Sequence, residues 1–133
     1  NVGPASTELV QIGRGKSTLD ELLDSVAKAT GRTVIADRKP ERGLLYRSES
    51  LVFARAGAPV LFLAPPDLEQ YLTTDYLRPS DTLRESFSFT GAAQDCALLY
   101  QLGWLTADSP TLPYFVPGDE FAPRAPAAPS AAP

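Results

Sequence analysis

The chain has 133 residues, of which 44% are hydrophobic, so it can bury the core of one domain of ordinary size. Its formal net charge of −4 argues against a nucleic-acid partner, because phosphate binding requires a basic surface. No apolar run reaches the ~18 residues of a transmembrane helix, and the single cysteine excludes an internal disulfide.

The first third of the chain predicts a strand, a helix and a second strand. Residues 8–13 form a short apolar run that ends in glycine, as a strand does. Thr18 and Glu21 have the spacing of a capping box, and Gly31 suits the position after the last helical turn. The helix between them carries one apolar stripe: Leu19, Leu22, Leu23, Val26 and Ala27. Residues 33–36 then predict a second short strand.

The sequence Gly13–Thr18 superficially suggests a phosphate-binding loop. The Walker pattern requires a glycine five positions before Gly15, and Val10 stands there. A turn that leads into the helix is therefore the better interpretation.

The middle of the chain predicts a short helix, a strand and a long loop. Asp37–Gly43 is charged and contains proline, so we expect a loop. Ser48 is a plausible N-cap for a helix that ends at Gly57. Residues 59–63 are apolar throughout, which is typical of a strand covered on both faces. Residues 64–88 show no periodicity, and a loop of this length is usually functional or mobile.

The last predicted element is a helix over residues 91–105, with Thr90 as its N-cap. Apolar residues surround most of its circumference, so we expect it to be largely buried. Cys96 lies among them and predicts an inert core thiol, since the chain has no histidine to activate it. Beyond Pro123 the Pro/Ala composition predicts a disordered tail.

This order of elements predicts an α/β fold with helices on the faces of a mostly parallel sheet. Three strands make a small sheet, so an edge or a face could remain exposed where a further half of the domain would pack. The sequence begins at Asn1 and contains no methionine. We therefore expect that it is part of a longer or processed protein.

Several separate segments resemble zinc aminopeptidases of the M28 peptidase family, in order and in spacing. Tyr46–Ser50 followed by Phe53–Pro59 is similar to that family's Tyr-Arg-Ser-Asp-His and Phe-Ala-x-x-Gly-x-Pro segments. Asp75–Asp81 is similar to its Tyr-His-x-x-Ser-Asp segment. Residues 15–22, 87–92 and 117–121 add to the likeness. The resemblance implies a partial, C-terminal half of a zinc-exopeptidase-like domain over residues 1–121, followed by the tail at 122–133.

The family resemblance implies two zinc ions, but it assigns no metal ligand or catalytic residue to this chain. The family's last zinc-binding histidine corresponds to Leu77, and the other ligands belong to the N-terminal half, which no segment of this chain resembles. Leucine has no donor atom for zinc. Glu49 and Ser50 stand where the family has Asp-His. Calcium remains an alternative for the carboxylates, but no EF-hand spacing is present.

The resemblance also implies a substrate pocket. Its candidate residues are Tyr46, Ser48, Glu49, Phe53, Tyr71, Tyr76 and Leu77. The alternative is that the aromatic residues among them are ordinary packing residues.

Three functions stay open at this point. The chain could be a fragment or degenerate member of the M28 aminopeptidases that does not hydrolyse peptides by itself. It could be a peptide- or protein-binding module derived from that fold, or one half of a complementing pair. The expected partners are a peptide N-terminus or an N-terminal half of the domain. The resemblance favours a periplasmic or secreted location.

Overall fold

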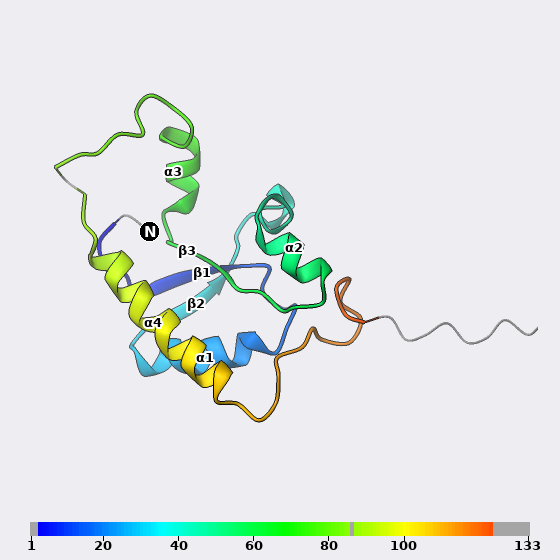
Figure 1. Ribbon diagram of the computed structural model, residues 1–133. Coiled ribbons are helices and arrows are strands. Elements are labelled where there is room, and N and C mark those ends of the chain that lie inside the picture. The colour runs from blue at the N-terminus through cyan, green and yellow to red at the C-terminus, as the bar shows by residue number, and fades with distance from the viewer. Residues whose placement is uncertain (1–2, 86, 124–133) are drawn as a thin grey trace, which may run out of the picture.

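A three-stranded sheet lies at the centre of the computed structural model, which describes residues 3–85 and 87–123 (Figure 1). The strands are β1 (Glu8–Ile12), β2 (Thr33–Ala36) and β3 (Phe62–Ala64), in the spatial order β2-β1-β3. β1 pairs with β2 in parallel, with Val10 opposite Ile35. β1 also pairs with β3, which runs antiparallel to it, with Val10 opposite Ala64. The fold is therefore α/β with a small mixed sheet.

The prediction of a mostly parallel sheet is thus only partly right, because β3 runs against both other strands. The cause lies in the connection between β2 and β3. It contains the 3₁₀ helices η1 (Pro40–Arg42) and η2 (Leu45–Arg47) and the six-residue helix α2 (Ser50–Arg55). A parallel strand needs a crossover that returns the chain to the starting end of the sheet, usually by a longer helix. Without one, β3 starts at the end where β2 finished.

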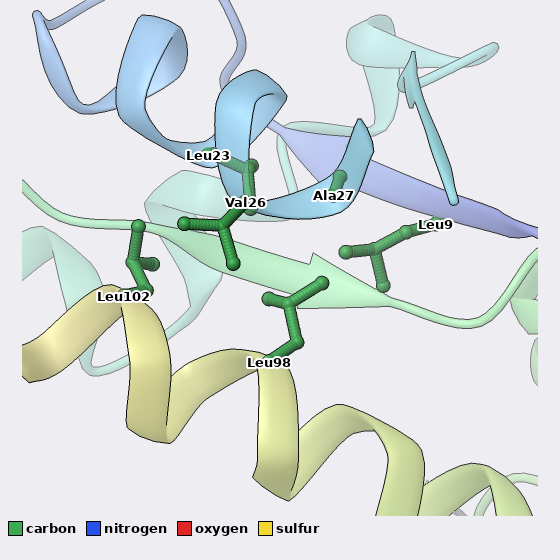
Figure 2. Close-up of a cluster of buried hydrophobic side chains, with 6 residues drawn as sticks. All are labelled: Leu9, Leu23, Val26, Ala27, Leu98 and Leu102. Atoms are coloured by element: carbon green, nitrogen blue, oxygen red, sulfur yellow. The ribbon is translucent and has the colours of Figure 1, made fainter. Parts of the chain in front are cut away.

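One face of the sheet is covered by the two longest helices, α1 (Leu19–Ala29) and α4 (Thr90–Ala107). Figure 2 shows the buried cluster that joins them, in which Leu98 and Leu102 of α4 point toward Val26 of α1 and Leu9 of β1. Leu23 and Ala27 complete the cluster. α1 thus supplies the apolar stripe that its sequence predicts.

The other face of the sheet packs on shorter elements. Side chains alternate along a strand, so Val10 and Ile12 point away from Leu9. They form a second cluster with Leu45 of η2 and Ala64 of β3. Leu68 packs against this cluster from α3 (Leu68–Thr74). This second face is the one that positions the candidate site.

Several predicted elements are confirmed, but the predicted side-chain caps of α1 and α2 are wrong. β1, α1, β2 and α4 begin and end within about two residues of their predicted bounds. The capping box is wrong: no side chain caps α1, since the Thr18 hydroxyl receives a hydrogen bond from Tyr114 N (3.1 Å) instead. Ser48 likewise does not cap α2, because its hydroxyl donates back to Leu45 O (2.9 Å).

The prediction of a loop from residue 64 to residue 88 is also wrong in part. β3 extends to Ala64, and α3 occupies residues 68–74. Leu68 and Leu72 are four positions apart and face the same side, which gives this short helix its packing contacts. Pro65 and Pro66 precede it and mask the periodicity.

The prediction that α4 is largely buried is wrong. Only Gly91, Leu98 and Leu102 of this helix are buried. Tyr100 and Trp104 are 71% and 63% exposed. Cys96 is exposed as well, so it is not a core thiol. An apolar circumference predicts burial on all sides only if elements exist to cover every side, and here α4 packs on the sheet and α1 with one face.

The C-terminal segment returns to the start of α1. Residues 114–116 run antiparallel to residues 16–18, with a bridge between Ser17 and Phe115. Phe115 is buried against Phe121, at 5.6 Å between ring centroids. The predicted tail at 122–133 falls outside the described residues from residue 124 on. No helix in the described ranges is long and apolar enough to cross a membrane.

Candidate functional site

A pocket of about 650 Å³ lies between the segment 42–49 and the pair β3–α3. Its apolar wall consists of Leu44, Phe62, Leu68, Leu72 and the two tyrosines Tyr71 and Tyr76. Arg42, Arg47, Ser48, Glu49 and Thr73 supply the polar groups. An apolar hollow with a few polar groups at its margin is the usual form of a small-ligand site.

The structure brings four of the seven predicted pocket residues together in this pocket: Ser48, Glu49, Tyr71 and Tyr76. The other three lie elsewhere. Tyr46 donates its hydroxyl hydrogen to Glu120. Phe53 is 60% exposed on α2, and Leu77 is 85% exposed after α3. Leu77 also has a φ of 57°, and among the described residues it is the one non-glycine residue with positive φ.

The charged groups at the pocket margin differ in how they are neutralised. Arg42 pairs with Glu69 at 2.7 Å, and Lys39 binds the same carboxylate at 2.8 Å. The hydrogen bond from Lys39 and the charge of Arg42 lower the pKa of Glu69. Arg47 and Glu49 are exposed and have no ion pair within residues 3–85 and 87–123. These two side chains are therefore free to meet a ligand that carries both charges.

A second hollow of about 440 Å³ lies on the other side of α3 and shares Leu68 and Tyr71 with the first. Tyr71 packs edge-on against Tyr76, with ring centroids 5.8 Å apart, and donates to Asp81 at 2.8 Å. This hydrogen bond raises the pKa of Tyr71. Asp75 binds Arg84, which lowers the pKa of Asp75. Of the three carboxylates that line this hollow, Asp75 and Asp81 are thus held by partners, and only Asp67 has no side-chain partner among the described residues, so the hollow offers less free charge than the first.

The residues present do not fit the zinc centre that the family resemblance implies. Leu77 has no donor atom, and the chain contains no histidine. Over the described ranges, no group of three or more His, Cys, Asp or Glu side chains is arranged to hold a metal ion. Glu69, Asp75 and Asp81 are each engaged by a cation or by Tyr71. We therefore derive no metal-dependent step from this chain.

One polar cluster was not predicted from the sequence. Lys16 Nζ lies 2.7 Å from Glu120 and 3.1 Å from Asp119, and it sits 5.2 Å from the centre of the Phe121 ring. Tyr46 donates to the same Glu120 carboxylate. The cluster joins three of the segments that carry the family resemblance. No local spacing connects residues so far apart, so only their shared membership of these segments could have indicated it.

No family model matches the chain, and no curated protein and no solved structure matches it.

Proposed function

We propose that this chain is a peptide-binding module of M28-aminopeptidase-like ancestry, which holds the N-terminal residue of a peptide in the 650 Å³ pocket without hydrolysing it. The proposal depends on one observation above all. Ser48, Glu49, Tyr71 and Tyr76, which the resemblance indicates as pocket residues, line one apolar hollow although they come from two separate segments.

The chemistry of the pocket suits the first residue of a peptide. The apolar wall around Phe62, Leu68 and Leu72 can take up an aliphatic or aromatic side chain. The Glu49 carboxylate can pair with a free α-ammonium group, and Arg47 can donate to a backbone carbonyl or a carboxylate. A ligand with one cationic and one acceptor group near an apolar side chain satisfies all three features.

Binding without hydrolysis follows from the residue types. Peptide hydrolysis of the family's kind needs a metal-activated water and a general base. Leu77 cannot replace the histidine ligand, and the chain contains no histidine at all. Hydrogen bonding and burial need none of these groups, so a pocket can keep its affinity after it loses catalysis.

The test is a titration of the full chain with a fluorescent tripeptide that has an apolar first residue and a free amino terminus. N-acetylation of the peptide and the Glu49→Gln variant should each weaken binding by about 10-fold or more, the usual value of a charge-assisted hydrogen bond. Glu21→Gln is the matched control. Glu21 is an exposed carboxylate on α1, on the opposite side of the sheet.

Equal affinity for the free and the acetylated peptide would contradict the proposal. So would a Glu49→Gln variant that binds as tightly as the Glu21→Gln control. Release of the free amino acid from the peptide by the purified chain would contradict the non-hydrolytic part.

A further inference from the structure

The outward side of α4 is a continuous apolar surface. It consists of seven exposed residues, defined here as the outer face of α4: Ala93, Cys96, Ala97, Tyr100, Gly103, Trp104 and Ala107. At 100° per residue, all seven lie within about 60° of Tyr100 around the helix axis. Tyr100 and Trp104 also lie against each other, with ring centroids 6.4 Å apart. Figure 1 shows α4 at the margin of the molecule, beside α1 and on the opposite side from α2.

The opposite side of α4 is the side that holds the fold together. Leu98 and Leu102 are 1% and 5% exposed and face the sheet (Figure 2). The helix therefore has two apolar sides, and its own fold uses one. A surface helix usually carries polar residues on the side that faces away from its own core, so packing within the fold does not explain the second apolar side. Exposed apolar patches of this kind mark interaction surfaces.

The outer face carries no charged side chain. The only charged residue within α4 is Asp95, which is bound by Arg32 at 2.7 Å on the inner side. A two-fold symmetric contact brings the groups at its axis against their own copies, so a charge near the axis would meet a like charge. An uncharged face avoids this penalty, whereas a partner recognised by charge would find no group to bind.

The sizes of the side chains along the outer face complement each other when two helices run antiparallel. Ala93, Ala97, Tyr100, Trp104 and Ala107 follow the alternating four- and three-residue spacing of a coiled-coil seam. With Tyr100 at the two-fold axis, Trp104 of one copy lies over Cys96 and Ala97 of the other. The bulky residue of each helix thus fills the space beside the small residues of its mate.

The ends of α4 agree with the same arrangement. Asp108 follows the last turn and is exposed, where its charge is unfavourable beside the negative end of its own helix dipole. The first turn of α4 contains no acidic residue. Antiparallel pairing places Asp108 near the first turn of the second copy, where a carboxylate is favourable.

We propose that this chain forms a symmetric dimer through the outer faces of two antiparallel α4 helices. The candidate pocket lies on the other face of the sheet and stays open in the dimer. The dimer and the proposed peptide binding can therefore fail independently. A single pair of helices is at the small end of specific interfaces, so a dissociation constant in the micromolar range is expected.

The first experiment measures molecular mass by sedimentation equilibrium over a wide range of protein concentration. The wild type should shift from monomer to dimer. Tyr100→Lys places like charges at the two-fold axis and should raise the dissociation constant by about 10-fold or more. Val52→Lys is the matched control, since Val52 is 70% exposed on α2, and it should dimerise as the wild type does. Far-ultraviolet circular dichroism checks that each variant is folded.

A wild type that stays monomeric at every concentration would overturn the proposal. So would a Tyr100→Lys variant that dimerises like Val52→Lys. A measured molecular mass that keeps rising beyond that of two chains as the concentration increases would also overturn it, because the two-fold contact closes on itself.

Disulfide cross-linking in a Cys96→Ser background tests the direction of the helices. Tyr100→Cys should cross-link readily, because the two copies meet at the axis. Ala93→Cys should not, since seven residues from the axis on each side separate the two positions by about 21 Å along the helices. A parallel pair would instead align each position with its own copy, so equal cross-linking at both sites would overturn the antiparallel arrangement.

Discussion

The guanidinium of Arg32 lies 2.7 Å from the carboxylate of Asp95, across 63 positions of the sequence. Arg32 stands between α1 and β2, and Asp95 lies on the first half of α4. The same guanidinium donates to Glu8 O of β1 at 3.3 Å. Arg32 Nε, by contrast, is buried without a hydrogen-bond partner among the described residues. This one buried cation therefore ties α4 to the sheet and depends on Asp95 for its neutralisation.

We expect Asp95→Asn to lower the free energy of unfolding by about 3 kcal/mol, because it leaves the Arg32 charge buried and uncompensated. Chemical denaturation followed by circular dichroism measures this change. Asp24→Asn is the control. It removes the partner of Arg14 in an exposed pair and should cost no more than about 1 kcal/mol. Equal effects of the two changes would contradict the role of Arg32.

Acidification should weaken the contact between the C-terminal segment and the start of α1. The hydrogen bonds from Lys16 and Tyr46 lower the pKa of Glu120 in the folded chain. A group with a lowered folded pKa contributes stability above its unfolded pKa and loses it as the pH falls through the folded value. The wild type should therefore lose stability more steeply than Glu120→Gln as the pH falls below about 4.3. Denaturant midpoints measured from neutral pH downward compare the two, and parallel pH profiles would refute the expectation.

The sequence predicts well those elements whose signal is local. The apolar stripe of α1 and the glycine after it define that helix, and the apolar run at residues 33–36 defines β2. The direction of β3 could not be predicted in this way, because it depends on the route of the chain between residues 37 and 61. The prediction that Thr18 caps α1 through its side chain is wrong for a related reason. Thr18 finds a partner in Tyr114, which no pattern near Thr18 indicates.

Leu77→Gly should stabilise the chain slightly. Leu77 adopts a φ of 57° and is 85% exposed, so a glycine there removes a steric penalty and loses little burial. We expect a gain of about 0.5 kcal/mol in the free energy of unfolding. Leu83→Gly is the matched control, since Leu83 is 82% exposed but has no positive φ. It should cost about 0.5–1 kcal/mol through the entropy of the unfolded chain. A loss at position 77 as large as that at position 83 would contradict this.

The isolated chain should hold no zinc after dialysis. The chain contains no histidine, and its single cysteine is exposed on α4, away from the candidate pocket. Inductively coupled plasma analysis of protein purified without chelator measures the metal content. The Leu77→His variant should also stay free of zinc, because one donor falls short of the three or four protein ligands of a zinc site. Stoichiometric zinc in the wild type would refute the prediction.

From the sequence, the candidate site could be predicted only in part, through the pocket residues that the proposed family resemblance implies. Ser48, Glu49, Tyr71 and Tyr76 are four of these, and they line one pocket. Phe62, Leu68 and Leu72 form its apolar wall but look in the sequence like ordinary core residues. The exposure of α4 was missed because apolar composition alone does not show how many elements are available to cover a helix.

The cluster that joins Leu9, Leu23, Leu98 and Leu102 has a consequence for the order in which the protein folds. Its two halves come from opposite ends of the described chain. During synthesis at about 5–20 residues per second, α1 and β1 leave the ribosome several seconds before α4 does. Until then, one side of the nascent sheet is uncovered, and its leucines are exposed to solvent. The protein is therefore most vulnerable in the interval before α4 is synthesised. A pause in translation ahead of residue 90 would lengthen this interval.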